Sequence, residues 1–231
     1  DLHVKEGESL VLMGPSGAGK SVILKHIIGL LKPDAGEVLV EGKIIHELSS
    51  NDLRNLRKDM GYLFQHAALI NWLDVFDNVA LPLRESRTLP EAEVKIKVEE
   101  VLTRVRMQDA LKKFPAELSG GQQQRVFLAR ALAQESDIYF MDEPFAGVDA
   151  ATESAIVAIL HELKDRGKTL LVVHHDLPTA KEYFDSLLLL NMRVVAFGPT
   201  EEVFKYDLLQ STYGGRLTIL SEVAEAVREK S

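Results

Sequence analysis

The feature that most restricts the fold of this chain is the glycine-rich segment Gly14-Pro15-Ser16-Gly17-Ala18-Gly19-Lys20-Ser21. It follows the apolar run Ser9–Met13, which has the length of a strand, and it leads into a helical pattern expected over 20–31. Glycines at these spacings let the backbone wrap closely around phosphate groups with its N–H groups pointing inward. The helix N-terminus that follows adds partial positive charge. The G-x-x-x-x-G-K-S pattern in this context therefore predicts a phosphate-binding loop rather than a plain turn.

Two side chains of this segment have distinct expected tasks. Lys20 is expected to reach the β and γ phosphates of a nucleoside triphosphate, and the Ser21 hydroxyl to help hold Mg²⁺. The other phosphate contacts are expected from the backbone of Gly14, Pro15, Ser16, Gly17, Ala18 and Gly19. We therefore predict ATP and Mg²⁺ as the ligands of this segment.

Short apolar runs rich in Val, Ile and Leu recur between helical patterns, which is typical of strands buried in a largely parallel sheet. With 231 residues, 46% of them hydrophobic, the chain can bury one substantial core. We predict an α/β domain. The expected strands are 9–13, 37–40, 60–64, 137–141, 169–173, 186–191 and 194–197, and the expected helices include 20–31, 75–81, 90–105 and 123–134.

The stretch from His66 to Leu118 has a different character, because it contains helical patterns and no convincing strand. Pro90 suits the start of a helix, and the acidic residues after it lie near the positive end of the helix dipole. We expect residues 66–118 to form an all-helical subdomain inserted into a core made of 1–65 and 119–231. The whole chain, 1–231, is then one domain.

An apolar run over 138–141 ends in two carboxylates, Asp142 and Glu143. Asp142 is expected to hold Mg²⁺ together with Ser21, and Glu143 to polarise the water that attacks the γ phosphate. An acidic strand end alone is more often structural. Together with a phosphate-binding loop, the catalytic interpretation is favoured.

The segment Leu118-Ser119-Gly120-Gly121-Gln122 precedes a helical pattern. Ser119 and Gln122 fit a capping box, so a simple well-capped helix is one interpretation. That interpretation leaves Gly120 and Gly121 unexplained, since glycines weaken a helical turn. A helix N-terminus without side chains is also a phosphate site. One chain cannot easily place it on the γ phosphate held by its own loop, whereas a two-fold dimer can.

Composition excludes some classes of function. The formal net charge of −8 argues against an electrostatic grip on nucleic acid, which needs clustered Lys and Arg. There is no cysteine, hence no disulfide framework, and no run approaches the roughly 20 apolar residues that span a bilayer. The first residues lack an apolar signal region, so we expect a cytoplasmic protein.

The phosphate-binding loop, Leu118-Ser119-Gly120-Gly121-Gln122, the Asp142–Glu143 pair and a downstream histidine together resemble the ATPases of the ATP-binding-cassette (ABC) class. The resemblance covers nearly the whole chain, and its motifs are specific in combination and order. It implies a RecA-like P-loop NTPase core and ATP hydrolysis coupled to transport. It also implies a homodimer arranged head-to-tail around two ATP molecules, integral-membrane permease partners, and a location on the inner face of the cell membrane.

The same resemblance assigns further residues. Gln65 matches the Q-loop glutamine that senses Mg²⁺ and water, so it is expected to act in catalysis and metal binding. Asp149 ends Ala146-Gly147-Val148-Asp149, which matches the D-loop at the dimer seam. His175 matches the switch histidine that contacts the γ phosphate. His174 occupies a place usually held by a small hydroxyl residue.

The sequence departs from the family in two respects. ABC ATPases usually carry a strand and an adenine-stacking aromatic about 25 residues before the loop; only 13 residues precede Gly14 here, none of them aromatic. We expect a small antiparallel sheet that is truncated at its start, and a weaker adenine contact. In addition, the first half resembles phospholipid-trafficking ATPases and the second half manganese and zinc importer ATPases, which raises the hypothesis of a chimera joined near Leu118–Gly121.

Two other functions compete with a transporter ATPase. One is a folded, nucleotide-binding scaffold with little turnover. The other is a soluble ABC-type machine that acts on ribosomes or DNA; such proteins usually carry two cassettes or a long coiled-coil insertion, for which the 66–118 stretch has no room.

Overall fold

The computed structural model describes residues 1–63, 69–86 and 89–214. Its central six-stranded sheet has the order β4-β5-β6-β1-β7-β8, in which only the β7–β8 pair is antiparallel. The strands are β1 (Ser9–Met13), β4 (Met60–Leu63), β5 (Ile138–Asp142), β6 (Thr169–Val173), β7 (Ser186–Asn191) and β8 (Arg193–Pro199). The predicted α/β class with a mostly parallel sheet is confirmed, and every predicted strand of this sheet lies within two residues of its observed bounds. Position 64 lies outside the described residues.

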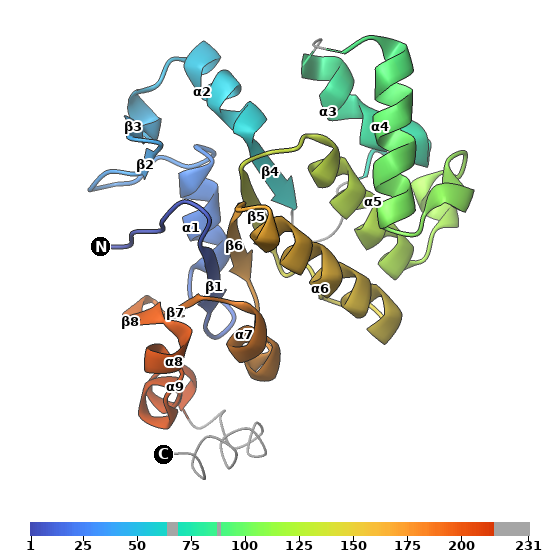
Figure 1. Cartoon of the computed structure of the whole chain (residues 1–231). Coiled ribbons are helices and arrows are strands. Elements are labelled where there is room, and N and C mark those ends of the chain that lie inside the picture. Colours follow the sequence, from blue (N-terminus) through green and yellow to red (C-terminus); the bar gives the residue numbers. More distant parts are fainter. Residues whose placement is uncertain (64–68, 87–88, 215–231) are drawn as a thin grey trace.

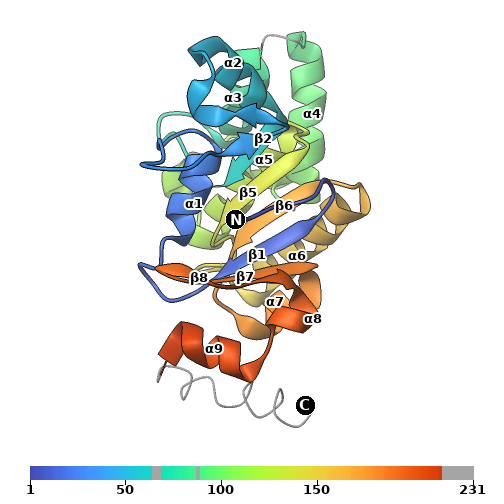
Figure 2. The ribbon, with the colours of Figure 1, turned by 90° about the vertical axis from the view of Figure 1, so that its left-hand side faces the viewer.

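The strands β1 and β6 are buried along their whole length because helices cover both faces of the sheet. Alternate residues of β1 face two separate hydrophobic clusters: Leu10 and Leu12 face one, Val11 and Met13 the other. The first cluster includes α1 (Lys20–Ile27), α2 (Ser50–Leu56), and a small antiparallel sheet of β2 (Leu39–Val40) and β3 (Lys43–Ile44). The second includes α5 (Gly120–Ala133), α6 (Ala150–Asp165), α7 (Leu177–Tyr183), α8 (Thr200–Val203) and α9 (Tyr206–Tyr213). Figure 2 shows α8 and α9 beside the β7–β8 edge.

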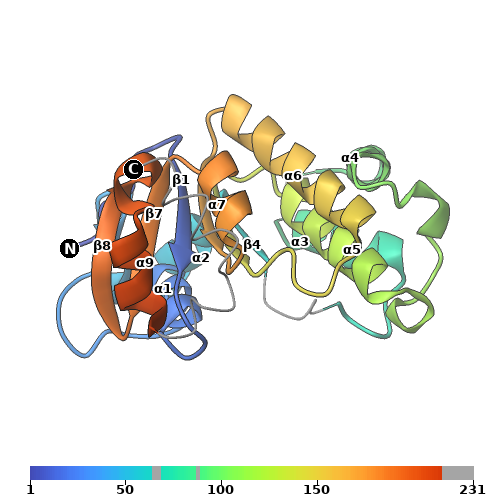
Figure 3. The same ribbon diagram turned by 90° about the horizontal axis from the view of Figure 1, so that it is seen from below.

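Between 69 and 118, the regular elements that the structure describes are all helical. They are α3 (Val75–Ser86), α4 (Glu91–Arg104), η3 (Gln108–Ala110) and η4 (Pro115–Glu117). The helices α3 and α4 pack against α5 through buried side chains such as Val79, Val98 and Leu128. Figures 1 and 3 show these three helices together on one side of the molecule, with α1 on the other. Two further short 3₁₀ turns, η1 (Ile45–Glu47) and η2 (Arg57–Asp59), flank α2.

Helix ends account for most of the differences from the predicted elements. The helix expected over 20–31 ends at Ile27, because Gly29 adopts a left-handed φ of 73° and the N–H of Leu30 bonds back to the carbonyl of Lys25 at 2.8 Å. A Cβ at Gly29 would lie 2.9 Å from Ile45. Among described residues, no helix is both long and apolar enough to cross a membrane.

Other boundaries differ as well. The helix expected from residue 123 begins at Gly120, since the cap at Ser119 stabilises a first turn that contains both glycines. The helix expected over 75–81 continues through Pro82 to Ser86. The strand expected over 37–40 is only Leu39–Val40, and its hairpin partner Lys43–Ile44 had no strand pattern to predict it.

Candidate active site

The C-terminal ends of three adjacent strands bring two of the predicted catalytic residues, Glu143 and His175, to the same side of the sheet as the phosphate-binding loop. The strands β5, β6 and β1 are parallel neighbours, with Asp142 paired to Val173 and Val173 paired to Leu12. The phosphate-binding loop follows β1, Glu143 follows β5, and His175 follows β6. This edge is where ligands bind in open α/β sheets.

The phosphate-binding loop is held against the end of β7. A Cβ on Gly14 would lie 1.9 Å from the carbonyl oxygen of Leu190, so only glycine fits there. Gly17, at φ 82°, faces open space: no heavy atom of the described residues would lie within 4 Å of a Cβ there. Gly19 is the N-cap of α1 and has no side chain with which to cap the helix. The first N–H groups of α1 are thus left for an anion.

Lys20 is folded over its own loop. Its Nζ donates hydrogen bonds to the carbonyl oxygens of Gly14 (2.8 Å) and Pro15 (3.1 Å), and the residue is only 8% exposed. Burial lowers the pKa of Lys20, while the nearby carboxylates of Glu143 and Asp142 raise it. The ammonium group is therefore held in a partly desolvated place with two negative charges near it.

A hydrogen bond joins two motifs that lie far apart in the sequence. Ser21 Oγ donates to Asp142 Oδ1 at 3.0 Å, and Asp142 is 4% exposed. Burial raises the pKa of Asp142, and the hydrogen bond from Ser21 lowers it. A hydroxyl and a carboxylate are hard oxygen ligands of the kind that Mg²⁺ takes, with phosphate oxygens and water completing its shell. The described residues contain no group of three His, Asp or Glu that could hold a metal alone.

Glu143 leaves the strand in an unusual conformation. Its φ is 53°, its N–H donates to the carbonyl of Val173 (3.0 Å), and its carbonyl accepts from Ala146 (3.1 Å). Left-handed backbone at a non-glycine residue costs free energy and clusters at active sites. The residue is partly exposed, next to the buried Asp142. His175 is exposed at the end of β6, and its ring centroid is 5.5 Å from that of His174.

The Ser119–Gln122 segment begins α5 and presents an open surface. Ser119 Oγ accepts from the N–H of Gln122 (3.3 Å) and Gln122 Oε1 accepts from the N–H of Ser119 (2.9 Å), so the predicted capping box is confirmed. Gly120 is exposed, and a Cβ there would meet no described atom within 4 Å. Gly121 is buried, with the Thr152 hydroxyl 3.2 Å from the position of a Cβ.

Asp149 caps α6 close to that segment. Its carboxylate accepts a hydrogen bond from the N–H of Thr152 (2.7 Å), which lowers its pKa, and the residue is exposed. Gln65 lies outside the described residues. The sequence-based prediction missed the Leu190 carbonyl behind the loop, and only its place at a strand end could have suggested it.

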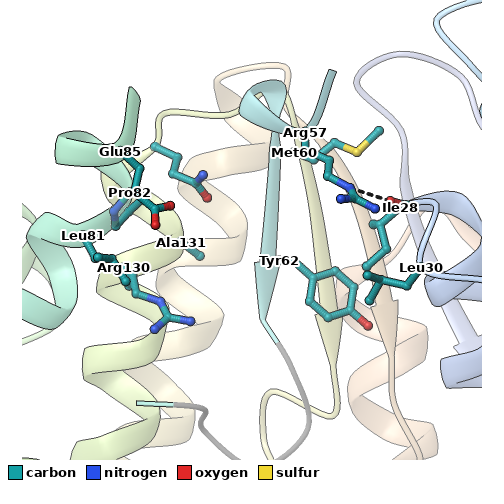
Figure 4. Close-up of a pocket in the computed structure, with 11 residues that line it drawn as sticks. Ile28, Leu30, Arg57, Met60, Tyr62, Leu81, Pro82, Glu85, Arg130 and Ala131 are labelled. Carbon is teal, nitrogen blue, oxygen red and sulfur yellow. Dashed lines mark hydrogen bonds between the residues drawn. The ribbon is translucent and has the colours of Figure 1, made fainter. Parts of the chain in front are cut away.

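A separate cavity of about 290 Å³ is lined by none of these residues and lies between β4, η2 and the turn after α1 on one side and α3 and α5 on the other. Figure 4 shows Arg57, Met60 and Tyr62 grouped with Ile28 and Leu30 on one side, and Leu81, Pro82, Glu85 and Arg130 on the other. Arg57 is fixed there by hydrogen bonds to the carbonyls of Ile28 (2.9 Å) and Gly29 (3.1 Å). The cavity therefore joins the sheet-bearing core to the helical part.

Comparisons with known proteins agree with this geometry. The family model described as "ABC transporter" matches residues 1–146. The manganese transport system ATP-binding protein MntB of Bacillus subtilis is 48% identical, over 99% of this chain and 91% of that protein. The intermembrane phospholipid transport system ATP-binding protein MlaF of Haemophilus influenzae is 39% identical, over 89% and 78%. The dimeric, post-hydrolysis structure of the ATP-binding cassette MJ0796 bound to ADP and Pi has a TM-score of 0.81 and 35% identity, covering 86% of this chain and 88% of that one.

These matches give no support to the chimera hypothesis, because the match to MntB covers 99% of this chain and so includes both halves. The resemblance of the first half to phospholipid-trafficking ATPases reflects a relative that is itself similar over most of the chain. The chain belongs to the ABC transporter family and is an ATP-hydrolysing, ATP-binding subunit of a transport system.

Proposed function

We propose that this chain holds ATP and Mg²⁺ on Gly14–Ser21 and hydrolyses the nucleotide when the Ser119–Gln122 segment of a second copy closes the site. The hydrogen bond from Ser21 to Asp142 carries this proposal, because it joins the phosphate-binding loop to the catalytic strand end. The residues present fit the ligands: an open, glycine-lined loop, a lysine beside it and a pair of hard oxygen atoms.

Each residue at the C-terminal ends of these strands has a defined task in this proposal. Lys20 exchanges its hydrogen bonds with the loop carbonyls for bonds to the β and γ phosphates. Ser21 and Asp142 hold Mg²⁺, with Gln65 as a further ligand. When bound, Mg²⁺ supplies positive charge that offsets the charge developing on the phosphate oxygens.

The Glu143 carboxylate accepts a hydrogen bond, and then the proton, from the attacking water. The water oxygen forms a bond to the γ phosphorus as the bond to the β–γ bridging oxygen breaks, so ADP and phosphate leave. His175 donates a hydrogen bond to the γ phosphate. Its exposed place at the end of β6 leaves the ring able to reach a ligand in the loop.

The second copy is needed because the α5 N-terminus faces outward. Ser119 and Gly120 are exposed, whereas Gly121 is closed off by Thr152 of the same chain. In a two-fold dimer, each copy offers its exposed end to the ATP of the other, and Asp149 lies at the seam. Hydrolysis then opens the dimer, and the change in its shape drives transport.

A mixing experiment tests the two-copy site. Lys20→Met disables the loop and Gly120→Asp places a negative charge where the γ phosphate of the partner would bind. Each variant alone has two defective sites, whereas a mixed dimer keeps one intact site. We expect ATPase activity to return on mixing and to be lost in Glu143→Gln. No recovery would mean that Ser119–Gln122 does not act on the partner's ATP, and no turnover in the unmodified chain would favour the scaffold.

We also propose that a membrane-embedded permease subunit binds at the cavity between the core and the helical part, at the cytoplasmic face of the membrane. The cavity is lined by apolar side chains and by charged ones, including Glu85 and Arg130. Leu30, at its rim, is 51% exposed. Because the cavity is lined by residues of both the core and the helical part, a partner bound there would respond to a change in the orientation of these two parts.

Leu30→Glu tests this docking, and Leu39→Glu is a matched control because Leu39 is 55% exposed and lies in the small sheet outside the cavity. We expect Leu30→Glu to keep its ATPase activity in isolation and to lose co-purification with the permease. Equal co-purification of both variants would place the permease elsewhere.

The transported substrate that the comparisons favour is a divalent transition metal such as manganese, because the 48% identical relative carries that name. Metal uptake by cells that express this chain with its permease, and the loss of that uptake in Glu143→Gln, tests the assignment. Phospholipid movement without metal uptake would contradict it.

A further inference from the structure

His174 is a buried histidine at the catalytic edge that has no task in the hydrolysis described above. It is 2% exposed, and its backbone N–H donates to the carbonyl of Leu12 at 3.1 Å, which fixes it beside β1. Both of its ring nitrogens are buried without a hydrogen-bond partner in the part of the chain that the structure describes. Its described contacts are therefore those of the ring faces and edges.

Two aromatic rings lie against the imidazole of His174. The Phe145 ring centroid is 4.8 Å away at an interplanar angle of 57°, and the His175 centroid is 5.5 Å away at 45°. Tilted rings at these separations attract each other. Phe145 is 9% exposed and lies two residues after Glu143. His174 is thus between the segment that carries the catalytic carboxylate and the exposed switch histidine.

The imidazole is neutral at ordinary working pH. Burial, together with the neighbouring His175, lowers the pKa of His174 to about 4, and Asp176 opposes this shift. A neutral ring can lie next to His175 in either protonation state of that residue without like-charge repulsion. Ring packing, rather than an ion pair, is consequently the interaction available to it.

We propose that His174 is a positioning residue whose ring, packed between Phe145 and His175, fixes the orientation of the His175 ring relative to Glu143. An exposed histidine otherwise samples several rotamers. If the His175 ring is ordered before ATP binds, its side-chain entropy is not lost during the reaction. His174 touches no reacting atom in this role. The inference rests on the proposed function, in which His175 contacts the γ phosphate.

Three variants test the role of the ring. His174→Ala removes it, His174→Phe keeps a ring without nitrogens, and Leu171→Ala opens a comparable space elsewhere on β6, where Leu171 is 4% exposed. We expect His174→Ala to lower kcat about 10-fold or more with the KM for ATP changed less than about twofold, since misplaced groups slow the chemical step. His174→Phe should retain most of kcat, and Leu171→Ala should retain the kcat of correctly folded protein. A wild-type kcat in His174→Ala, or an equal loss in His174→Phe, overturns the proposal.

A second measurement does not require turnover. In nucleotide-free protein labelled at histidine, the ring protons of His175 should carry a ring-current shift that disappears in His174→Ala, persists in His174→Phe and changes in Phe145→Leu. If the His175 signals were the same in all four proteins, the ring contact would not order His175. Absence of ATPase activity in the unmodified chain would refute the proposed function alone, because the spectra still decide the ring contact.

Discussion

Two helix N-termini of this molecule are glycine-rich, and they are completed in opposite ways. At α1, the phosphate-binding loop lies directly against the carbonyl of Leu190, which is possible because Gly14 has no Cβ. The side chain of Lys20 folds over the loop and donates a hydrogen bond to it. At α5, Ser119 and Gln122 satisfy each other, and Gly120 remains in the open. The first end is built by contacts with distant parts of the same chain. The second is formed by residues that are neighbours in the sequence, and its outer surface remains exposed.

The difference also concerns the supply of hydrogen-bond donors. Gly19 offers no side-chain cap, so the first N–H groups of α1 stay available to phosphate. At α5, the N–H groups of Ser119 and Gln122 are already engaged and Gly121 is buried, which leaves the N–H of the exposed Gly120. The α5 end is therefore the weaker anion site, and it is suited to complete a site that another loop has already formed.

The largest expected effect is that of adding a single methyl group at the locked end. Gly14→Ala places a Cβ 1.9 Å from a backbone oxygen that cannot move without disturbing β7. We expect a loss of more than about 4 kcal/mol in the free energy of unfolding, or no folded protein, measured by urea denaturation. The matched variant Gly120→Ala, in open space, should be near wild type. A stable Gly14→Ala protein would show that the loop is not locked.

Acid should also destabilise the fold through His174, which follows β6 and is hydrogen-bonded to β1 beside the phosphate-binding loop. His174 has a folded-state pKa of about 4, below its unfolded value of 6.5, so the unfolded chain takes up the proton first. The stability that depends on the neutral ring is fully present above pH 6.5 and is lost as the pH falls toward 4, by about 3 kcal/mol in total. Urea denaturation from pH 7 to 4 measures it. His174→Phe should show a shallower fall, and an equal fall in both proteins would contradict this origin.

Lys20, at the N-terminus of α1, should contribute to ATP affinity but not to folding stability. Lys20→Met keeps an unbranched side chain, one atom shorter, and removes the ammonium group, whose pKa is lowered by burial. We expect ATP affinity to fall about 10- to 100-fold, as for the loss of a charged hydrogen bond, with no loss of folding stability. Calorimetric titration and denaturation measure the two quantities. Lys32→Met, at an exposed position beyond the end of the same helix, is the control and should leave ATP affinity unchanged.

The smallest expected effect is at the open end. Ser119→Ala removes an N-cap hydrogen bond, which should lower the free energy of unfolding by about 1 kcal/mol. ATP binding by the monomer should be unchanged, because this helix end does not face the loop of its own chain in the proposed arrangement. A parallel loss of monomer ATP affinity would show that the two ends communicate within one chain.

The sequence was most informative where a structural element depends on neighbouring residues alone. Apolar runs predicted the strands at 9–13, 169–173 and 186–191 with their observed bounds, because strands buried on both faces contain few polar residues. The capping box at Ser119 was likewise visible in four consecutive residues. Local chemistry of this kind does not depend on the rest of the fold.

Contacts between distant segments could not be predicted in this way. Nothing near Gly14 in the sequence indicates that the Leu190 carbonyl lies behind it, and nothing near His174 indicates the Phe145 ring. Asn78 is a third case, because in the sequence it looks like an ordinary polar residue. In the structure it is fully buried, and its side chain is hydrogen-bonded to the backbone of Ile70 and Leu73. Such positions depend on the three-dimensional arrangement, so only the structure reveals them.

The central place of β1 in the sheet has a consequence for how the protein is made. Ser9 pairs with Leu170, 161 residues later in the chain, and Leu10 pairs with Ser186 later still. At ribosomal rates the apolar strand therefore waits roughly 10 to 30 s for its first neighbour. During that interval the apolar β1 segment has no neighbouring strand, and the phosphate-binding loop has no contact with β7. We therefore expect a newly made molecule to bind nucleotide only after β6 and β7 have left the ribosome.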